Sequence, residues 1–324
     1  MSYKRSILLT GGTHGLGYEA ALKLAKDHPD YLIVVASRSD KEKAAENINQ
    51  KLGQSNTQWM KLDLSDPSSV RSFAQQWIAD TAKPPLQVLM FNAGLQFPTD
   101  LTLTPEGLEK TFAIAHVGHA MLFHLLYPQL VTGGRVVLTS SGTHDPAQKS
   151  GLPDAEYNTA QDLAYPPKNM VDIPGRKRYS TAKLCNVLWG YALAKRLAER
   201  APERKITVTS MDPGLMPGTD LAREASKIER FLWYHVLPRT IGLLRLLVHP
   251  NVHSPAESGA ALARLATGSD VEGVTGKYFE SLREIKSSED SYDVAKQDDL
   301  WDWTVNYVAQ GDTTEKARLD SLKL

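Results

Sequence analysis

The sequence predicts an α/β protein: one doubly wound domain over residues 1–324, with helices on both faces of a mostly parallel, seven-stranded sheet. Short apolar segments alternate along the chain with longer segments whose apolar residues recur at helical spacing. This alternation is typical of a parallel sheet, because each crossover between parallel strands is long enough to form a helix. No linker rich in Gly, Ser or Pro and no internal repeat divides the chain, so one domain is favoured over two.

Seven segments are expected to form the strands, because each is short and apolar and is bounded by turn-forming or polar residues. They are residues 6–10, 31–36, 57–62, 86–91, 135–139, 205–210 and 276–279. Helices are expected over residues 15–26, residues 41–52, two stretches within 104–130, and residues 179–199. Another helix is expected to begin at Pro67, since Asp66 can act as its N-cap and proline suits the first helical position.

Two segments fit this alternation poorly, residues 144–177 and residues 214–255. Both follow predicted strand ends, where open α/β sheets bind ligands, so we expect a long active-site insertion and a helical lid over the ligand. The lid contains an apolar stretch, residues 231–248, that charged residues and a proline interrupt. Since a membrane-spanning helix needs about 20 mostly uncharged residues, no transmembrane segment is expected. A pocket-lining helix pair is favoured over shallow membrane contact.

The composition argues against several classes of protein. The 37 Lys and Arg residues balance 37 Asp and Glu residues, whereas a nucleic-acid-binding protein normally has a basic excess. Cys185 is the only cysteine, so no intrachain disulfide can form and a reducing compartment is indicated. The first apolar run is too short for the core of a signal peptide, which favours a cytoplasmic location. The spacing of His116, His119 and His124 gives no clear metal-binding face, so no metal is expected.

The segment between the first predicted strand and the first predicted helix is rich in glycine. Glycine lets the backbone turn tightly and approach a pyrophosphate, while a helix N-terminus offers free N–H groups and a partial positive charge. The segment therefore predicts a dinucleotide-binding loop; the alternative is a glycine-rich turn without a ligand. The candidate contacts are Gly11, Thr13, His14, Gly15, Leu16 and Gly17.

The end of the second predicted strand indicates which dinucleotide is bound. NAD-binding proteins usually place an acidic residue there to hold the ribose 2′-hydroxyl, but this chain has Arg38. An arginine can pair with a 2′-phosphate, which a carboxylate would repel, and His14 can add a donor nearby. NADP(H) is therefore favoured over NAD(H). The alternative is that Arg38 is only a solvated surface charge.

Tyr179 and Lys183 are four residues apart in a predicted helix, so their side chains share a face. An unperturbed phenol has a pKa of about 10 and exchanges protons poorly near neutral pH. A nearby ammonium group favours the phenolate and is expected to lower this pKa, which would make the tyrosine usable as an acid and base. The same spacing also occurs on helices that face solvent.

Together these segments resemble the short-chain dehydrogenase/reductase family over almost the whole chain. The glycine-rich segment matches the family's coenzyme loop, and Tyr179 and Lys183 match its active-site pair. The remaining motifs are Asp63-Leu64 after the third strand, Asn92-Ala93-Gly94 after the fourth, Ser141 after the fifth and Pro213-Gly214 after the sixth. The resemblance implies a Rossmann domain that binds the adenine at the first of these motifs and the nicotinamide at the last.

The resemblance also implies a reaction. A hydride passes between the nicotinamide and a substrate carbonyl, whose oxygen accepts a hydrogen bond from Ser141 and exchanges a proton with Tyr179. Lys183 binds the nicotinamide ribose. The flanks of Lys183 and Pro213 resemble the branch of retinol-dehydrogenase-like and protochlorophyllide-reductase-like enzymes, many of which act on bulky apolar carbonyls or alcohols. The apolar lid fits such a substrate, with Trp233 as its candidate contact. Both a homodimer and a monomer are compatible with this branch.

One position departs from the family pattern. Ala115 stands where members usually have an asparagine, which helps to hold a water that links the lysine to solvent. We hypothesise that His116 carries protons by another path. The departure also keeps open a second class of protein, an NADP(H)-binding sensor or partner with little turnover. Fold analogy further leaves open an enzyme that reduces a C=C or C=N bond.

Overall fold

The computed structural model describes residues 3–97, 100–219, 226–247 and 249–323. At its centre is an eight-stranded sheet with the order β3-β2-β1-β4-β5-β6-β7-β8. The strands from β1 to β7 pair in parallel, and β8 pairs antiparallel to β7. The strands are β1 (Arg5–Thr10), β2 (Tyr31–Ser37), β3 (Thr57–Lys61), β4 (Leu86–Phe91), β5 (Leu130–Thr139), β6 (Thr207–Asp212), β7 (Lys277–Glu280) and β8 (Arg283–Ile285).

The predicted α/β class is confirmed, but the predicted count of seven strands is wrong. The additional strand is β8, which has three residues, none of them buried. A short, polar edge strand lacks the apolar run by which buried strands are recognised. The other strands were recognised because helices cover both faces of the sheet, so that β1, β2 and β4 are apolar and buried along most of their length.

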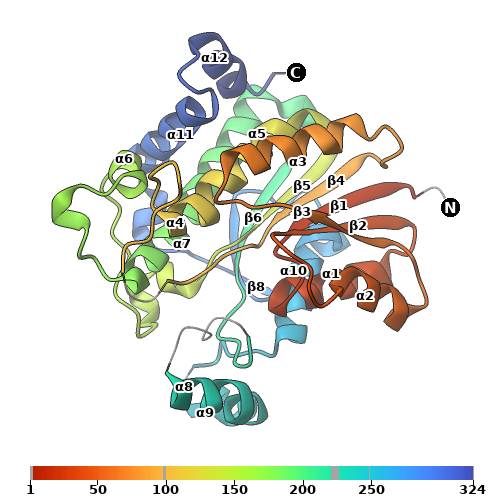
Figure 1. Ribbon diagram of the computed structural model, residues 1–324, viewed down its shortest axis with the longest axis vertical. Helices are drawn as coiled ribbons and strands as arrows, with labels where there is room; N and C mark the ends of the chain where they lie inside the picture. Colours follow the sequence, from red (N-terminus) through yellow and green to blue (C-terminus); the bar gives the residue numbers. More distant parts are fainter. Residues whose placement is uncertain (1–2, 98–99, 220–225, 248, 324) are drawn as a thin grey trace.

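Helices cover the sheet in two layers (Figure 1). One layer contains α1 (Gly15–Asp27), α2 (Ala44–Leu52) and α10 (Pro255–Thr267), and the other contains α3 (Pro67–Ala79), α5 (Gly118–Leu126) and α7 (Gly175–Arg200). Each layer forms its own apolar core against the sheet. The predicted start of α3 is confirmed, because the Asp66 carboxylate accepts the backbone N–H of Ser68 and Pro67 is the first helical residue.

The two helices expected within residues 104–130 form one nearly continuous helical segment. It begins only at α4 (Lys110–Phe112), passes through a π-helical turn at Ala113–Val117 and continues as α5. Residues 144–177 contain 3-10 turns and the short helix α6 (Ala160–Ala164). This insertion packs against the C-terminal part of the chain, where the Tyr157 hydroxyl donates a 2.7 Å hydrogen bond to Asp299.

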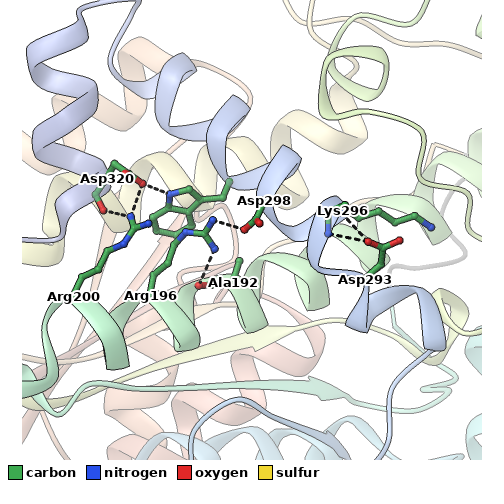
Figure 2. A network of polar contacts seen from close by, with 9 residues as sticks. Ala192, Arg196, Arg200, Asp293, Lys296, Asp298 and Asp320 are labelled. Atoms are coloured by element: carbon green, nitrogen blue, oxygen red, sulfur yellow. Dashed lines mark hydrogen bonds and ion pairs between the residues drawn. The ribbon is translucent and has the colours of Figure 1, made fainter.

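The C-terminal helices α11 (Val294–Val308) and α12 (Thr313–Ser321) extend the layer of α7 (Figure 1). Figure 2 shows the polar contacts that join these helices to α7. Asp320 accepts hydrogen bonds from Arg200 and from the indole of Trp301, both at 2.6 Å, while Arg196 donates to Asp298 at 2.7 Å. Since Trp301 is fully buried, the contact ties both C-terminal helices to the core.

A helical arm lies between β6 and α10. It consists of α8 (Lys227–Phe231), the helical turns Leu232–Val236 and Leu237–Arg239, and α9 (Ile241–Leu247). The arm stands away from the sheet and its helical layers at the bottom of Figure 1. Among the helices that the structure describes, none is both long enough and apolar enough to cross a membrane.

Candidate active site

The glycine-rich loop joins the end of β1 to the start of α1 and requires its glycines for close packing. Gly11 has a φ of +70° and Gly15 a φ of +52°, a region that favours glycine. A Cβ atom on Gly17 would lie 2.2 Å from the carbonyl oxygen of Gly11. The side chain of His14, the N-cap of α1, makes no capping hydrogen bond with the residues that the structure describes. The first N–H groups of α1 are therefore available to an anion, as a pyrophosphate-binding loop requires.

Thr10 and Asn92 join the ends of β1 and β4 beneath this loop. The Thr10 hydroxyl oxygen accepts the backbone N–H groups of Asn92 at 3.0 Å and Ala93 at 3.1 Å. The Asn92 amide donates to the Thr10 carbonyl at 3.0 Å. The same Thr10 hydroxyl lies 2.8 Å from Nε2 of buried His119. This network holds the Asn-Ala-Gly motif against the glycine loop, and its members Thr10 and His119 were not among the predicted site residues.

The residues expected to hold the adenine half of the coenzyme lie at the ends of β2 and β3. Arg38 is exposed, and within the described ranges its guanidinium has no ion-pair partner, so it is free to bind an anionic ligand. One oxygen of Asp63 accepts both the backbone N–H and the hydroxyl of Ser65. Leu64 is buried. Gly118 of α5 packs so closely against it that a Cβ atom on Gly118 would lie 2.4 Å from the Leu64 carbonyl oxygen. This close contact holds the turn against α5.

Ser141, Tyr179 and Lys183 converge at the end of β5. Ser141 follows this strand, and its hydroxyl is close enough to Tyr179, near the start of α7, to lower the pKa of that phenol. Lys183 lies one helical turn further along α7, with its Nζ 5.6 Å from the centre of the Tyr179 ring. That ammonium donates to the Thr139 carbonyl at 3.0 Å and lies 3.3 Å from the position of a Cβ atom on Gly94. The geometry therefore brings the predicted group together beside the Asn-Ala-Gly motif.

The electrostatics of this group differ from the sequence-based expectation. Burial raises the pKa of Tyr179 to about 12, and the Asp212 carboxylate adds to the rise, while the Ser141 hydroxyl opposes it. Burial also lowers the pKa of Lys183 to about 8, with Asp212 opposing the fall. The prediction that Lys183 lowers the pKa of Tyr179 is therefore wrong. The ammonium is bonded to the Thr139 carbonyl, and desolvation dominates both groups.

Asp212, at the end of β6, is a buried carboxylate that the sequence analysis did not select. One oxygen accepts the backbone N–H of Gly214 at 2.9 Å, and the other accepts the side-chain amide of Asn251 at 2.7 Å. A Cβ atom on Gly142 would lie 2.9 Å from the second oxygen. Asp212 thus joins the residue after Ser141 to the Pro213-Gly214 turn. Its position, a carboxylate ending a buried strand, was the signal available in the sequence.

His144 fixes the segment that carries Ser141. Its Nε2 accepts the backbone N–H of Ser288 at 3.1 Å, so its Nδ1 carries the proton and donates to the Ser141 carbonyl at 2.7 Å. Burial lowers the pKa of His144, which keeps this neutral tautomer. The partner, Ser288, is far away in the sequence, and no local pattern identified His144 as a positioning residue.

The hypothesis that His116 carries protons to the active-site lysine does not agree with the structure. The Nε2 atom of His116 lies 2.7 Å from the hydroxyl of Thr304 on α11, and its ring packs against Phe112 and Trp189. Burial lowers its pKa to about 3, so the ring is neutral at physiological pH. His116 is therefore part of the core under the C-terminal helices. Ala115 is buried in the π-helical turn, where its carbonyl oxygen lies 3.1 Å from Nδ1 of His119.

The predicted nicotinamide turn and the predicted substrate contact lie in different surroundings. The Pro213 carbonyl accepts the hydroxyl of Ser258 on α10 at 2.7 Å, which anchors the turn. The Trp233 indole donates to the Thr219 carbonyl at 2.8 Å, and the Thr219 side chain lies 3.6 Å from the position of a Cβ atom on Gly15. These contacts connect Trp233 to the glycine loop rather than to Ser141 and Tyr179.

A separate small cavity lies between the 144–177 insertion and the first turns of α7. Arg178 and Ala182 belong to its wall, together with Leu163 and Met170 of the insertion. Ser141, Tyr179 and Lys183 do not line it. The cavity therefore lies on a different flank of α7 from the candidate catalytic group.

A doubly wound sheet with a glycine loop at its carboxyl edge defines the class of dinucleotide-binding Rossmann proteins. The chain belongs to the short-chain dehydrogenase family, a family of oxidoreductases: residues 5–151 match the family model described as short chain dehydrogenase. It is also 31% identical over 308 residues to the WW domain-containing oxidoreductase of Drosophila melanogaster, covering 94% of this chain and 69% of that protein. These matches confirm the family, and the retinol-dehydrogenase-like branch, that the motifs resemble.

Other known proteins share the sequence or the fold. Polyprenol dehydrogenase of Danio rerio is 29% identical, covering 91% of this chain and 83% of the relative. The crystal structure of the angucycline C-6 ketoreductase LanV with bound NADP has a TM-score of 0.60 at 21% identity, covering 85% of this chain and 93% of that chain. A 3-oxoacyl-[acyl-carrier protein] reductase from Brucella melitensis in complex with NAD has a TM-score of 0.62 at 20% identity, covering 87% and 97%. These structural likenesses confirm the fold.

Proposed function

We propose that this protein is an NADP(H)-dependent oxidoreductase that interconverts a carbonyl and an alcohol on a bulky apolar substrate. The observation that carries the proposal is the convergence of Ser141, Tyr179 and Lys183 beside Gly94, close to the glycine loop. A phenol, a hydroxyl and an ammonium at one point are the groups that a carbonyl oxygen needs when it gains a proton.

The residues present fit a nicotinamide dinucleotide. The glycine loop is so closely packed that a side chain on Gly17 would collide with the Gly11 carbonyl, and the N-terminus of α1 is open to a pyrophosphate. The rest of the adenosine half of the coenzyme, and its link to the nicotinamide half, would be held by Asp63, Leu64, Asn92 and Ala93. On the nicotinamide side, Lys183 would hold the ribose and the Pro213-Gly214 turn the ring. When bound, the nicotinamide supplies or accepts the hydride.

The protein's own residues govern the proton. A tyrosine whose pKa is raised to about 12 is a neutral phenol near pH 7, so it carries the proton that the substrate oxygen needs, although a raised pKa makes it a weaker acid than an ordinary phenol. In the reducing direction the substrate carbon gains the hydride, and the substrate oxygen takes the proton of Tyr179. Ser141 donates a hydrogen bond to that oxygen as negative charge develops there. Lys183 supplies a positive charge close by, which Asp212 helps to retain despite burial.

The coenzyme preference and the substrate class have separate supports. An exposed Arg38 at the end of β2 favours the 2′-phosphate of NADP(H). The apolar arm after the Pro213-Gly214 turn, within the predicted 214–255 lid, favours a bulky apolar substrate. One relative over most of the chain is named polyprenol dehydrogenase, which acts on such a compound. We assign the 144–177 insertion to the other side of the substrate site, and we keep a cytoplasmic location and a homodimer as predictions.

The substitution Tyr179→Phe tests the proposed chemistry. It removes the proton donor but keeps the ring, so carbonyl reduction should fall by a factor of roughly 10² to 10⁴, while NADPH binding measured by fluorescence titration stays within about twofold of the wild type. The substrates are aromatic, terpenoid, retinoid and polyprenyl carbonyls, with product identification. Tyr292→Phe is the matched control, since Tyr292 is 48% exposed and lies outside both the catalytic group and the 144–177 insertion.

Two outcomes would contradict the proposal. Turnover of Tyr179→Phe at the wild-type rate would exclude the tyrosine as proton donor. If the wild type bound NADPH tightly but reduced no carbonyl, the alternative of an NADP(H)-binding sensor or partner protein would be favoured. That alternative is left open because Ala115 stands where the family usually has an asparagine. Product identification also separates carbonyl reduction from reduction of a conjugated C=C bond.

A further inference from the structure

Within the described chain, exposed large apolar side chains are most concentrated on the arm after β6. The structure describes residues 226–247 of this arm, and none of them is buried. Exposed large apolar side chains are concentrated on it, whereas elsewhere they are scattered. They are Ile228, Phe231, Leu232, Val236, Leu243, Leu246 and Leu247. A concentration of exposed apolar side chains on one short segment is typical of an interaction site.

The same arm is basic in a chain whose formal net charge is zero. It carries Lys227, Arg230, Arg239 and Arg245 but only one acidic residue, Glu229, within the described residues 226–247. Arg245 is paired with Glu257 on α10 at 2.7 Å. The other three cations have no ion-pair partner within the ranges that the structure describes, so their charge is available to an anionic partner.

The base of the arm is fixed next to the coenzyme loop and the nicotinamide turn. Leu215, immediately after Gly214, donates its N–H to the Asn251 carbonyl at 2.9 Å and accepts the N–H of His253 at 2.9 Å. These bonds join the segment that precedes the arm in the sequence to the segment that follows it. Trp233 is tied to Thr219, whose side chain lies beside Gly15, so the arm is held close to the predicted coenzyme loop.

We propose that the arm docks on the surface of a lipid bilayer that contains anionic headgroups. Its leucines and Phe231 enter the boundary between headgroups and acyl chains, while Lys227, Arg230 and Arg239 pair with lipid phosphates. Interfacial helices bind in this way, by apolar burial combined with attraction of Lys and Arg to anionic lipid. A bulky apolar substrate dissolved in the bilayer then reaches the active site at the base of the arm. The substrate route rests on the proposed function, but the docking does not.

Vesicle co-sedimentation tests the docking. The full-length protein is mixed with vesicles of phosphatidylcholine alone, or with about one third phosphatidylglycerol. We expect binding to the anionic vesicles to be at least about tenfold stronger, and the difference to shrink at high salt, because salt screens the attraction. Leu246 and Leu247 are 80% and 71% exposed, so the double variant Leu246→Glu/Leu247→Glu should fold normally and lose binding to both kinds of vesicle.

Two further variants separate the contribution of the arm's apolar side chains to vesicle binding from that of its positive charge. Leu282→Glu is the matched control, because Leu282 is 59% exposed but lies outside the arm, and its binding should equal that of the wild type. Arg230→Gln/Arg239→Gln should lose most of the preference for anionic vesicles. NADPH titration of each variant confirms that it is folded and keeps the test independent of turnover.

Several results would overturn the docking. One is a wild-type protein that stays in the supernatant with both kinds of vesicle. A second is a concentration-dependent dimer that Leu246→Glu/Leu247→Glu dissociates without changing vesicle binding, since a second copy would then cover the arm. A third is protection of the arm from protease by NADPH alone, equal to that with vesicles, since the arm would then close on the body. Vesicle binding without any turnover would count against the proposed function only.

Discussion

Arg38 is the residue on which the proposed preference for NADP(H) depends. In the described ranges it has no partner, so Arg38→Gln removes a charge that serves no structural contact. We expect the KM for NADPH to rise roughly 10- to 100-fold, which corresponds to the loss of one or two charge-assisted hydrogen bonds. The KM for NADH should change little, because that coenzyme has no 2′-phosphate. Steady-state kinetics with both coenzymes measure the difference.

Lys41→Gln is the control for this prediction, since it removes a nearby exposed charge outside the predicted contact. A general loss of positive charge would affect both variants alike, whereas a 2′-phosphate contact affects only Arg38→Gln. An equal rise of KM for NADPH and NADH in Arg38→Gln would contradict the assignment, because it would point to a damaged loop.

The raised pKa of Tyr179 and the lowered pKa of Lys183 have a common cause, which is burial. Near pH 7 the tyrosine keeps its proton and the lysine, with a pKa of about 8, is mostly charged. This is the protonation state that carbonyl reduction requires, since the phenol must donate. Alcohol oxidation requires the opposite state of the tyrosine, the phenolate.

At the scale of elements, the sequence predicted the buried strands well and the exposed or irregular segments poorly. The bounds of β4 were predicted correctly because the strand is apolar along its length and ends at Asn92-Ala93-Gly94. In contrast, residues 104–109 precede the helix rather than belong to it, since Thr104 closes a turn by accepting the N–H of Gly107. Such a turn depends on local backbone bonds that apolar spacing does not reveal.

The C-terminal helices depend on Asp320, and its replacement is expected to destabilise the fold. The carboxylate is the acceptor for the Trp301 indole and for Arg200, both at 2.6 Å (Figure 2). Burial alone would raise the pKa of Asp320, but these hydrogen bonds outweigh it and lower the pKa. Asp320→Ala would leave the buried indole N–H unpaired, so we expect a loss of about 1–3 kcal/mol in the free energy of unfolding.

Urea unfolding followed by tryptophan fluorescence measures this loss. Asp302→Ala is the matched control, because Asp302 is an exposed acidic residue on α11 and should cost less than about 0.5 kcal/mol. If both variants unfolded at the same urea concentration, the hydrogen bonds of Asp320 would contribute nothing measurable, and apolar packing alone would hold the C-terminal helices.

At the scale of the whole molecule, the candidate site divides into residues that the sequence reveals and residues that only the fold reveals. Ser141, Tyr179 and Lys183 belong to local motifs, and the structure places them together as predicted. Asp212 and His144 act through partners far away in the chain, Asn251 and Ser288. No periodicity or spacing encodes a contact across so many residues, so these positioning residues could be found only from the folded chain.

The buried histidines predict how the stability of the whole molecule depends on pH. Burial lowers the pKa of His116 and His119 to about 3 and that of His124 to about 4, from an ordinary value of 6.5. These groups stay neutral in the fold but take up protons when the chain unfolds. Stability is therefore full above about pH 6.5 and falls as the pH decreases toward the folded pKa values. At about pH 5 each of the three should cost about 2 kcal/mol.

Urea unfolding at about pH 7 and about pH 5 measures this dependence. The three histidines together should lower the free energy of unfolding by about 6 kcal/mol between these conditions. In His124→Leu about one third of this loss should disappear, because one titrating group is gone. The Nε2 atom of His124 has no hydrogen-bond partner among the described residues, so leucine removes no observed bond there. A pH dependence equal to that of the wild type would show that His124 is protonated in the folded chain, and that burial in this core does not exclude the charge.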